Sequence, residues 1–527
     1  MERQPALHRV VPVLLLAASA VLSAPAAALE RSADPVAAFD TYAEEARRAW
    51  RVPGLAVAVV DGGEVVLARG YGVRDLDASA PEGSGSAVDE DTLFAIGSTT
   101  KAMTAALLGQ LAAVGELSWD DPVIDHLPAF RLKDPYATRE VTIRDLLTHR
   151  AGLGNADLLW YGADRSWEEI FPKLAGIEPA YSLRDGFVYQ NLMYAVAGHL
   201  AARVAGSPWE SLMEDRLFEP LGMERTVPTL ARTAARDNVA APHHEIEGEI
   251  RRIDNEPVDP VAPAGAVWSS AAELSRWVRM LLAEGAWEGG RVLPEETVAE
   301  LFRPQTLIPR EAFYPTAELT DPHWTSYGLG WFQQDYRGLM VQFHTGSIDG
   351  MSAIVGLVPE EELGVVVLAN LDHAELRHAL LWKALDLFTG SAKSGTESGA
   401  EEERDWSAEV RELYAERERR AEEAEAARDE RRVDGTSPSL ALERYAGRYT
   451  HPLYDRVEVR RDGAGLRLVA GARRTADLEH WHFDTFRARW DREWQGSTMV
   501  TFGLDETGAP GRLWVMGTAF EREDGDE

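Results

Sequence analysis

The spacing of hydrophobic and polar residues divides most of the chain into three parts. Two apolar runs flank an Asp-Gly-Gly turn within residues 54–72, and glycine pairs of this kind supply the positive φ angles of tight hairpins. Helical periodicity dominates from about residue 98 to 300, with several patterns ended by glycine. Strand patterns return over 327–346 and 351–371, before a helical pattern over 374–388. The pattern predicts an α+β domain: one antiparallel sheet built from both ends of the domain, covered by helices, with a mainly helical lobe inserted.

The last part of the chain has a different character. Small residues dominate 389–400, and the charged helical pattern that follows has too few apolar positions to form a core. We interpret 391–436 as a linker and charged spacer helix. Short strand patterns separated by glycine turns then fill 437–525, which predicts a small all-β barrel or sandwich domain. The preceding α+β domain would span 33–390.

The first residues predict a secretory signal. Arg3, His8 and Arg9 precede an apolar run over 10–22, and small residues follow it. We expect a signal peptide over 1–28 and hence a periplasmic or secreted protein. The run is shorter than the roughly 20 residues of a membrane span, and no other stretch is apolar enough, so no span is expected.

Composition narrows the possible chemistry. The 527 residues are 45% hydrophobic, which allows a large core, and they include no cysteine. Disulfides, thiol nucleophiles and cysteine zinc sites are therefore excluded. The formal net charge of -33 disfavours binding to nucleic acid and to anionic membranes. The sequence leaves the oligomeric state open.

Ser98 and Lys101 form the first candidate catalytic pair. They stand at positions i and i+3 where an apolar run gives way to a helical pattern, so one helical face can bring the amine beside the hydroxyl. A buried lysine that has lost its proton can act as a base toward serine. A serine helix cap followed by an ordinary surface lysine would have the same spacing.

Two later motifs favour the catalytic interpretation. Tyr189 and Asn191 precede a helical pattern, and His344-Thr345-Gly346 ends a strand pattern. The order Ser-x-x-Lys, Tyr-x-Asn, then Lys or His-Thr-Gly is the signature of the serine β-lactamase and penicillin-binding protein superfamily. The structural alternatives are a core aromatic for Tyr189, a helix cap for Asn191 and a strand-end hydrogen bond for His344.

Between about Val52 and Leu387 the sequence resembles the class C β-lactamase-like serine hydrolases. That family includes D-aminopeptidases, D-alanyl-D-alanine carboxypeptidases, esterases and β-lactamases. The stretches VPGLAVAVV, LLTHRAGL, GAVWSSAAELSRW and YGLGWF also resemble recurrent segments of the family. The resemblance implies a β-lactamase/transpeptidase-like fold. The C-terminal strands resemble the lipocalin-like module appended to some of these hydrolases. We interpret His149, in LLTHRAGL, as structural.

The resemblance also implies a catalytic role for three side chains. Ser98 would attack the substrate carbonyl, and Lys101 would accept or relay its proton. The family tyrosine that matches Tyr189 takes part in this transfer and in activating the water that hydrolyses the acyl-serine. No metal or organic cofactor is implied.

Other residues would bind the substrate. Asn191 would orient the lysine amine and bind a substrate amide. The segment His344, Thr345 and Gly346 would line the substrate site, and the backbone N–H groups of Ser98 and Ser347 would form the oxyanion hole.

Other catalytic motifs are missing from the sequence. The neighbouring His243 and His244 do not form a His-Glu-x-x-His zinc motif. There is no dinucleotide turn, Walker loop or Gly-x-Ser-x-Gly elbow. Glu178 lacks the companion asparagine expected beside the glutamate base of class A enzymes, which favours deacylation through Tyr189.

The residue type at position 344 helps to predict the class of substrate. Most β-lactamases of the superfamily carry lysine there, whereas a histidine with a pKa of about 6.5 would hold a carboxylate only when protonated. We therefore expect a hydrolase of small esters or peptides, including those with D-amino acids, of the esterase, D-aminopeptidase or D,D-carboxypeptidase type. β-Lactam hydrolysis would be weak or incidental. The alternative is a non-catalytic penicillin- or peptide-binding protein on the same fold.

Overall fold

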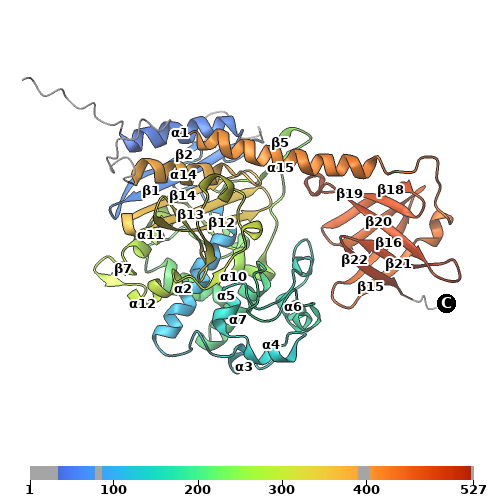
Figure 1. The fold of residues 1–527 in the computed structure, drawn as a ribbon, viewed down its shortest axis with the longest axis horizontal. Coiled ribbons are helices and arrows are strands. Elements are labelled where there is room, and N and C mark those ends of the chain that lie inside the picture. Colours follow the sequence, from blue (N-terminus) through green and yellow to red (C-terminus); the bar gives the residue numbers. More distant parts are fainter. Residues whose placement is uncertain (1–33, 78–85, 390–403, 524–527) are drawn as a thin grey trace, which may run out of the picture.

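A long helix joins an α+β domain to a β-barrel in the computed structural model (Figure 1). The structure describes residues 34–77, 86–389 and 404–523. The expected signal peptide, 1–28, and the first part of the expected linker lie outside these described residues.

One eight-stranded antiparallel sheet forms the centre of the α+β domain, in the order β2-β1-β14-β13-β12-β11-β10-β9. The early strand β1 pairs with the late strand β14, with Val57 opposite Val367. The prediction of one sheet built from both ends of the domain is therefore confirmed. The strands are β1 (Gly54–Asp61), β2 (Glu64–Gly72), β9 (Thr306–Leu307), β10 (Thr325–Tyr327), β11 (Phe332–Tyr336), β12 (Leu339–Ile348), β13 (Met351–Val358) and β14 (Leu363–Ala369).

Both faces of this sheet are buried. Alternate side chains of a strand point to opposite faces. Leu55 and Val57 of β1 therefore pack in a core with α1 (Pro35–Ala49) and α14 (Leu376–Phe388), whereas Ala56 and Ala58 pack in a core with α2 (Thr100–Ala113) and α11 (Ala271–Leu282). A strand buried on both faces needs a continuous apolar run, which β1 has. The sheet thus separates two helical layers.

The helical lobe lies between β2 and β9 in the sequence, as predicted. Short strand pairs accompany it: β3 (Phe94–Ala95) with β6 (Trp268–Ser269), β4 (His243–Ile246) with β5 (Glu249–Arg252), and β7 (Ala286–Trp287) with β8 (Gly290–Arg291). The helices of the whole domain are α1 (Pro35–Ala49), α2 (Thr100–Ala113), α3 (Val123–His126), α4 (Pro135–Glu140), α5 (Ile143–Leu147), α6 (Trp167–Ile170), α7 (Leu192–Ala205), α8 (Trp209–Met213), α9 (Leu230–Thr233), α10 (Ala262–Gly265), α11 (Ala271–Leu282), α12 (Glu295–Leu301), α13 (Ala317–Thr320) and α14 (Leu376–Phe388).

The charged helix α15 (Trp406–Asp429) is more than a spacer. Its first turns belong to the α+β domain, because Trp406 and Val410 are buried in the core beneath α1 and α14. The Trp406 indole also donates to Asp386 at 2.7 Å. At its other end Asp429 accepts from the barrel residue Arg487 at 2.7 Å. The helix is thus attached at both ends, with a polar and exposed middle.

The C-terminal strands form a closed eight-stranded antiparallel barrel, with β15 paired to β22. Its aromatic and aliphatic side chains form a third hydrophobic core that includes Tyr445, Phe486 and Phe502. The strands are β15 (Gly447–His451), β16 (Asp455–Asp462), β17 (Gly465–Gly471), β18 (Arg474–His482), β19 (Thr485–Trp490), β20 (Ser497–Leu504), β21 (Pro510–Val515) and β22 (Thr518–Arg522).

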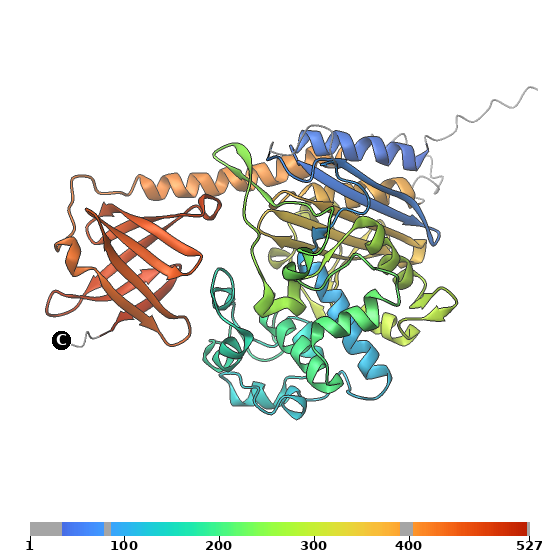
Figure 2. The same cartoon turned by 180° about the vertical axis from the view of Figure 1, so that it is seen from behind.

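The barrel faces the helical lobe. Seen from behind, the segment around α6 reaches toward the barrel (Figure 2). Arg165 and Lys173, on either side of α6, both pair with Asp455 of the barrel, at 3.0 and 2.5 Å. Among the described residues, no helix combines the length and the apolar character needed to cross a membrane.

Candidate active site

Ser98 lies in the turn that enters α2. The short strand β3 leads into a 3-10 turn, Gly97–Thr99, and α2 begins at Thr100. Gly97 has a φ of 51°, and a Cβ atom at this position would lie 2.6 Å from the backbone nitrogen of Ser347. The glycine therefore permits both the turn and its close approach to β12. The Ser98 side chain makes no cap hydrogen bond to this helix, so the cap alternative does not describe it.

Gly346 provides the matching close contact from β12. A Cβ atom on Gly346 would lie 1.8 Å from the carbonyl oxygen of Ile96 and 3.0 Å from the backbone nitrogen of Ser98. Since real Cβ atoms do not approach within 3.0 Å, the two backbones can lie side by side only with glycine here. The peptide nitrogen of Ser98 thus lies next to Gly346, and that of Ser347 lies next to Gly97.

Lys101 is completely buried beside the serine. Its Nζ atom lies 2.9 Å from Ser98 Oγ, 2.8 Å from Asn191 Oδ1 and 2.9 Å from the carbonyl oxygen of Ala264 in α10. The amide and peptide oxygens can only accept hydrogen bonds. A neutral amine has two N–H bonds for these two acceptors and one lone pair left for the hydroxyl of Ser98. The three contacts fit both forms: an ammonium donates to all three oxygens, including Ser98 Oγ, whereas a neutral amine can accept the proton of Ser98.

The electrostatic surroundings of Lys101 favour the neutral form. Burial holds the pKa of Lys101 well below its usual value of 10.5, and the carboxylate of Asp157 partly opposes this shift. Desolvation disfavours the charged form of an amine because the interior solvates an ammonium poorly.

Tyr189 stands beside this amine. Lys101 Nζ lies 4.7 Å from the centre of the Tyr189 ring, which also stacks on Phe332 at 6.1 Å. Burial raises the pKa of the Tyr189 hydroxyl well above 10, while a hydrogen bond with Ser98 lowers it by less. Tyr189 is therefore protonated near neutral pH and can donate to, or relay a proton from, an atom next to Ser98.

Asn191 occupies the N-cap position of α7 without capping it. Instead its Oδ1 atom accepts from Lys101, and its Nδ2 atom lies 3.3 Å from Asp157 Oδ1. The same Asp157 oxygen accepts from the indole of Trp160 at 2.7 Å. Asp157 was not predicted from the sequence, because nothing in its local pattern marks it as a partner of Asn191.

His344 stands where most β-lactamases of the superfamily carry a lysine, and its surroundings are apolar and aromatic. Its side chain is buried, with Nε2 2.9 Å from the hydroxyl of Tyr327 and its ring 6.2 Å from that of Tyr189. Burial lowers the pKa of His344 to about 3. This lowered pKa leaves the imidazole neutral near pH 7, where a histidine with the reference pKa of about 6.5 would also be mostly neutral.

Two further side chains hold the end of β12. The hydroxyl of Tyr314 lies 2.5 Å from Oγ1 of Thr345. The guanidinium of Arg377 in α14 donates to the carbonyl oxygen of Gly346 at 2.6 Å and to Oγ of Ser347 at 2.8 Å. Neither residue belongs to a motif, and both come from segments distant in sequence, so sequence reasoning missed them.

His149 packs behind Tyr189. Its Nδ1 atom accepts from the backbone N–H of Gln190 at 2.9 Å, and its ring lies 4.4 Å from the Tyr189 ring. These contacts hold the Tyr-x-Asn segment in place, which agrees with a structural role for the histidine.

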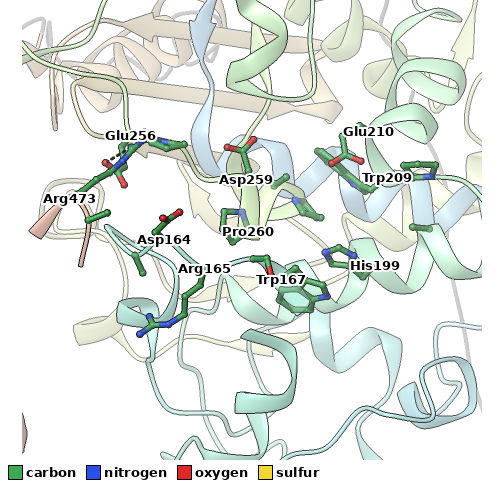
Figure 3. Close-up of a pocket in the computed structure, with 18 residues that line it drawn as sticks. Asp164, Arg165, Trp167, His199, Trp209, Glu210, Glu256, Asp259, Pro260 and Arg473 are labelled. Atoms are coloured by element: carbon green, nitrogen blue, oxygen red, sulfur yellow. Dashed lines mark hydrogen bonds and ion pairs between the residues drawn. The ribbon is translucent and has the colours of Figure 1, made fainter. Parts of the chain in front are cut away.

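A cavity of about 730 Å³ is lined in part by Ala262 and Pro263 of α10, and Figure 3 shows its lining side chains. Its walls include Trp167, His199 and Pro263, and it extends to Arg473 of the barrel. Pro263 directly precedes Ala264, whose carbonyl oxygen binds Lys101. The Trp167 and His199 rings stack at 4.6 Å.

Comparisons with known proteins identify family matches in both parts of the chain. The model of the beta-lactamase family matches residues 39–388, and that of a domain of unknown function, DUF3471, matches 431–525. The chain is 30% identical over 463 residues to the protein named unguisins hydrolase ungD of Aspergillus violaceofuscus, covering 82% of this chain and 78% of the relative. It is 33% identical over 330 residues to penicillin-binding protein 4 of Amycolatopsis lactamdurans, covering 60% of this chain and 81% of the relative.

Solved structures share the fold. The octameric penicillin-binding protein homologue from Pyrococcus abyssi is 21% identical, with a TM-score of 0.58, over 92% of this chain and 99% of that chain. A D-stereospecific amidohydrolase from a Streptomyces species is 24% identical, with a TM-score of 0.53, over 67% of this chain and 98% of that chain.

Proposed function

Because this chain belongs to the beta-lactamase family of serine hydrolases, we propose that it hydrolyses small esters or peptides through an acyl-Ser98 intermediate. The observation that supports this most directly is the position of Lys101 Nζ, 2.9 Å from Ser98 Oγ, with its other two contacts made to oxygens that can only accept. A helix cap and a surface lysine would need none of these contacts.

Acylation follows from this geometry. Lys101 takes the proton of Ser98 as Oγ attacks the carbonyl carbon of the substrate. The developing negative charge on the carbonyl oxygen is stabilised by the peptide N–H groups of Ser98 and Ser347, which lie next to Gly346 and Gly97 respectively. The proton then passes through Tyr189 to the leaving alcohol or amine.

Deacylation uses the same groups in reverse. A water molecule replaces the leaving group beside Tyr189 and gives up a proton through Tyr189 to Lys101 as it attacks the acyl carbon. The tetrahedral intermediate is again held by the two peptide N–H groups, and Ser98 leaves with a proton returned from Lys101. Asn191 keeps the amine oriented and offers its amide to a substrate amide.

The proposed substrates are peptides, including those with D-amino acids, and small esters. The relative from Aspergillus violaceofuscus is named an unguisins hydrolase, and the relative from Amycolatopsis lactamdurans is named a penicillin-binding protein. The neutral imidazole of His344 provides no fixed charge for a carboxylate beside the scissile bond, so β-lactam turnover should be slow. The proposal includes export, with removal of residues 1–28, which the mass of the protein purified from culture medium or periplasm would test.

A labelling experiment tests the acyl-serine mechanism. The purified protein and its Ser98→Ala variant are treated with a fluorescent fluorophosphonate and with a fluorescent penicillin, and then assayed with D-aminoacyl amides, short-chain p-nitrophenyl esters and nitrocefin. We expect Ser98-dependent labelling and turnover of esters or amides. Labelling without turnover would favour the alternative, a penicillin- or peptide-binding protein. No labelling at Ser98 would overturn the mechanism.

A further inference from the structure

A second cavity, of about 420 Å³, lies where the barrel meets the α+β domain. The α+β domain contributes Leu158, Tyr161 and Asp349 to its wall, and the barrel contributes Arg474, Trp494 and Gln495. A direct hydrogen bond crosses the junction: the indole of Trp494 donates to Asp349 at 3.0 Å.

Two residues of the cavity wall are close in sequence to residues of the proposed active site. Leu158 follows Asp157, whose carboxylate contacts Asn191. Asp349 stands two residues after Ser347, the second peptide donor of the proposed oxyanion hole. A substrate whose scissile carbonyl sits at Ser98 can therefore extend its acyl portion along the end of β12 toward the barrel.

Arg474 is the unusual residue of the cavity. Its guanidinium stacks over the ring of Tyr161, with Cζ 4.9 Å from the ring centre, and donates only to the weak acceptor Sδ of Met516, at 3.4 Å. Within the described part of the chain, no carboxylate oxygen lies within 4.0 Å of its nitrogens. Asp349 and Glu256 attract the charge from a greater distance, while burial lowers the pKa of Arg474. Most of its five N–H donors therefore have no acceptor among the described residues, and because the side chain is only half-buried they face solvent, where a ligand can reach them.

The α+β domain is shaped to receive this side chain. Gly162 has a φ of 65°, and a Cβ atom at this position would lie 2.7 Å from Nε of Arg474. Any other residue at 162 would move the guanidinium away from Tyr161. The barrel arginine and the glycine of the facing loop thus form a fitted contact.

Gln495 adds a second donor without a partner. Its Nε2 atom is buried and makes no hydrogen bond to any described residue. A buried amide N–H left without an acceptor costs free energy that a ligand oxygen would recover. The two unpaired donors come from different parts of the barrel and line the same space.

The carboxylates of the cavity, by contrast, already have partners. Asp349 accepts from the hydroxyl of Tyr161 at 2.8 Å and from Trp494. Asp372 accepts from the backbone of Gly350 at 2.9 Å, and His244 Nε2 lies 3.3 Å from it. The groups that still lack partners are hydrogen-bond donors, so the cavity favours a ligand with an anionic acceptor.

We propose that this cavity binds the far end of the substrate's acyl group, and that the group is an apolar chain ending in a carboxylate. Tyr161, Trp490 and Trp494 offer aromatic surface to the chain, and Arg474 with Gln495 binds the carboxylate. The inference rests on the proposed function and gives it a substrate class. It also gives the barrel a part in substrate selection.

Matched ester pairs test this preference. Each pair has the same p-nitrophenyl leaving group and an adipoyl or suberoyl chain whose far end is either a free carboxylate or its methyl ester. We expect the wild-type enzyme to have a higher kcat/KM for the free acid. Arg474→Met should reduce the ratio of acid to methyl ester about tenfold, and Gln495→Leu should reduce it about threefold.

Arg512→Met provides a matched control. Like Arg474, Arg512 is a barrel arginine that stacks over an aromatic ring, with Cζ 5.5 Å from the centre of the Trp514 ring. Unlike Arg474, it is exposed and does not line this cavity. It should leave the ratio unchanged. An unchanged ratio in Arg474→Met, or a wild-type preference for the methyl esters, would overturn the proposal.

A binding measurement separates this inference from the proposed function. Adipic acid monoanilide is titrated calorimetrically into the Ser98→Ala variant, with and without Arg474→Met, so that turnover is not needed. Tenfold weaker binding in the double variant supports the cavity even if no ester is hydrolysed. Equal affinity in the two variants overturns it even if hydrolysis is fast. The melting temperature of each variant, measured alongside, would show whether weaker binding comes from loss of folding.

Discussion

Asp157 and Lys101 are linked through a single side-chain amide. Asn191 accepts from the Lys101 amine at 2.8 Å through Oδ1 and lies 3.3 Å from Asp157 through Nδ2. An amide held at both ends cannot rotate to exchange its oxygen and nitrogen, so it presents only its acceptor to the amine. The carboxylate thus fixes the orientation of the lysine and also acts on its charge.

Asp157→Asn should move the acidic limb of the pH profile to lower pH. Activity requires neutral Lys101, and the Asp157 carboxylate raises the pKa of Lys101 against the larger effect of burial. Removing that charge lowers the pKa, so the neutral amine persists to lower pH. We expect kcat itself to fall about three- to tenfold because Asn191 is held less firmly.

The measurement is kcat/KM against pH for one ester. Asp164→Asn, in the same loop but with an exposed side chain, is the control and should leave the profile unchanged. An acidic limb displaced to higher pH in Asp157→Asn would contradict the assignment of Lys101 as the base.

Lys101→Arg should lower kcat about a thousandfold or more. Arginine keeps the positive charge but does not release its proton at any physiological pH, so it cannot accept the proton of Ser98. Lys133→Arg, at an exposed lysine paired with Glu178, should behave as the wild type. Stopped-flow acylation with a chromogenic ester measures the step directly. Near-normal acylation in Lys101→Arg would show that another group takes the proton.

Gly346→Ala should reduce kcat/KM about a hundredfold or more, with little change in secondary structure. The added methyl group would meet the carbonyl oxygen of Ile96 at 1.8 Å, so β12 must move away from the Ser98 turn and separate the two peptide donors. Gly290→Ala, where the nearest atom to the new Cβ would be 3.6 Å away, is the control. Full activity in Gly346→Ala would mean that the oxyanion hole lies elsewhere.

For substrates with a carboxylate beside the scissile bond, KM should be almost independent of pH between about 5 and 9. The pKa of His344 is lowered to about 3, so the imidazole is already neutral at pH 5 and has no charge to lose as the pH rises. Steady-state kinetics on acidic and neutral esters of the same size would test this. A KM that rises for the acidic ester alone, and no longer does so in His344→Gln, would show that the histidine titrates in the cleft.

The α+β fold could be predicted because its signals are local and ordered. The hairpin over 54–72, the helical middle and the late strands each have a distinct periodicity, and sheet closure between β1 and β14 follows from burying apolar runs at both ends. The pair of Ser98 and Lys101 was recognisable because one helix face sets their distance.

The rest of the site depends on contacts between distant segments. Asp157 reaches Asn191 from a loop, and Arg377 reaches Gly346 from α14. No local pattern encodes either contact. The size of the pKa shift at His344 could not be predicted for a related reason: it depends on burial beside Tyr327 and Phe332, which a reference value for histidine cannot include.

The length of helix α15 fixes which side of the barrel faces the α+β domain. Its 24 residues span about 36 Å, and each residue adds about 1.5 Å and 100° of rotation. Inserting one residue into its polar middle would therefore turn a different side of the barrel toward the α+β domain. Replacing exposed residues there would leave the orientation of the barrel unchanged. In a chain built this way, helix length rather than helix composition decides which barrel side chains face the α+β domain, so a change in the length of this helix would change the surface that the barrel presents.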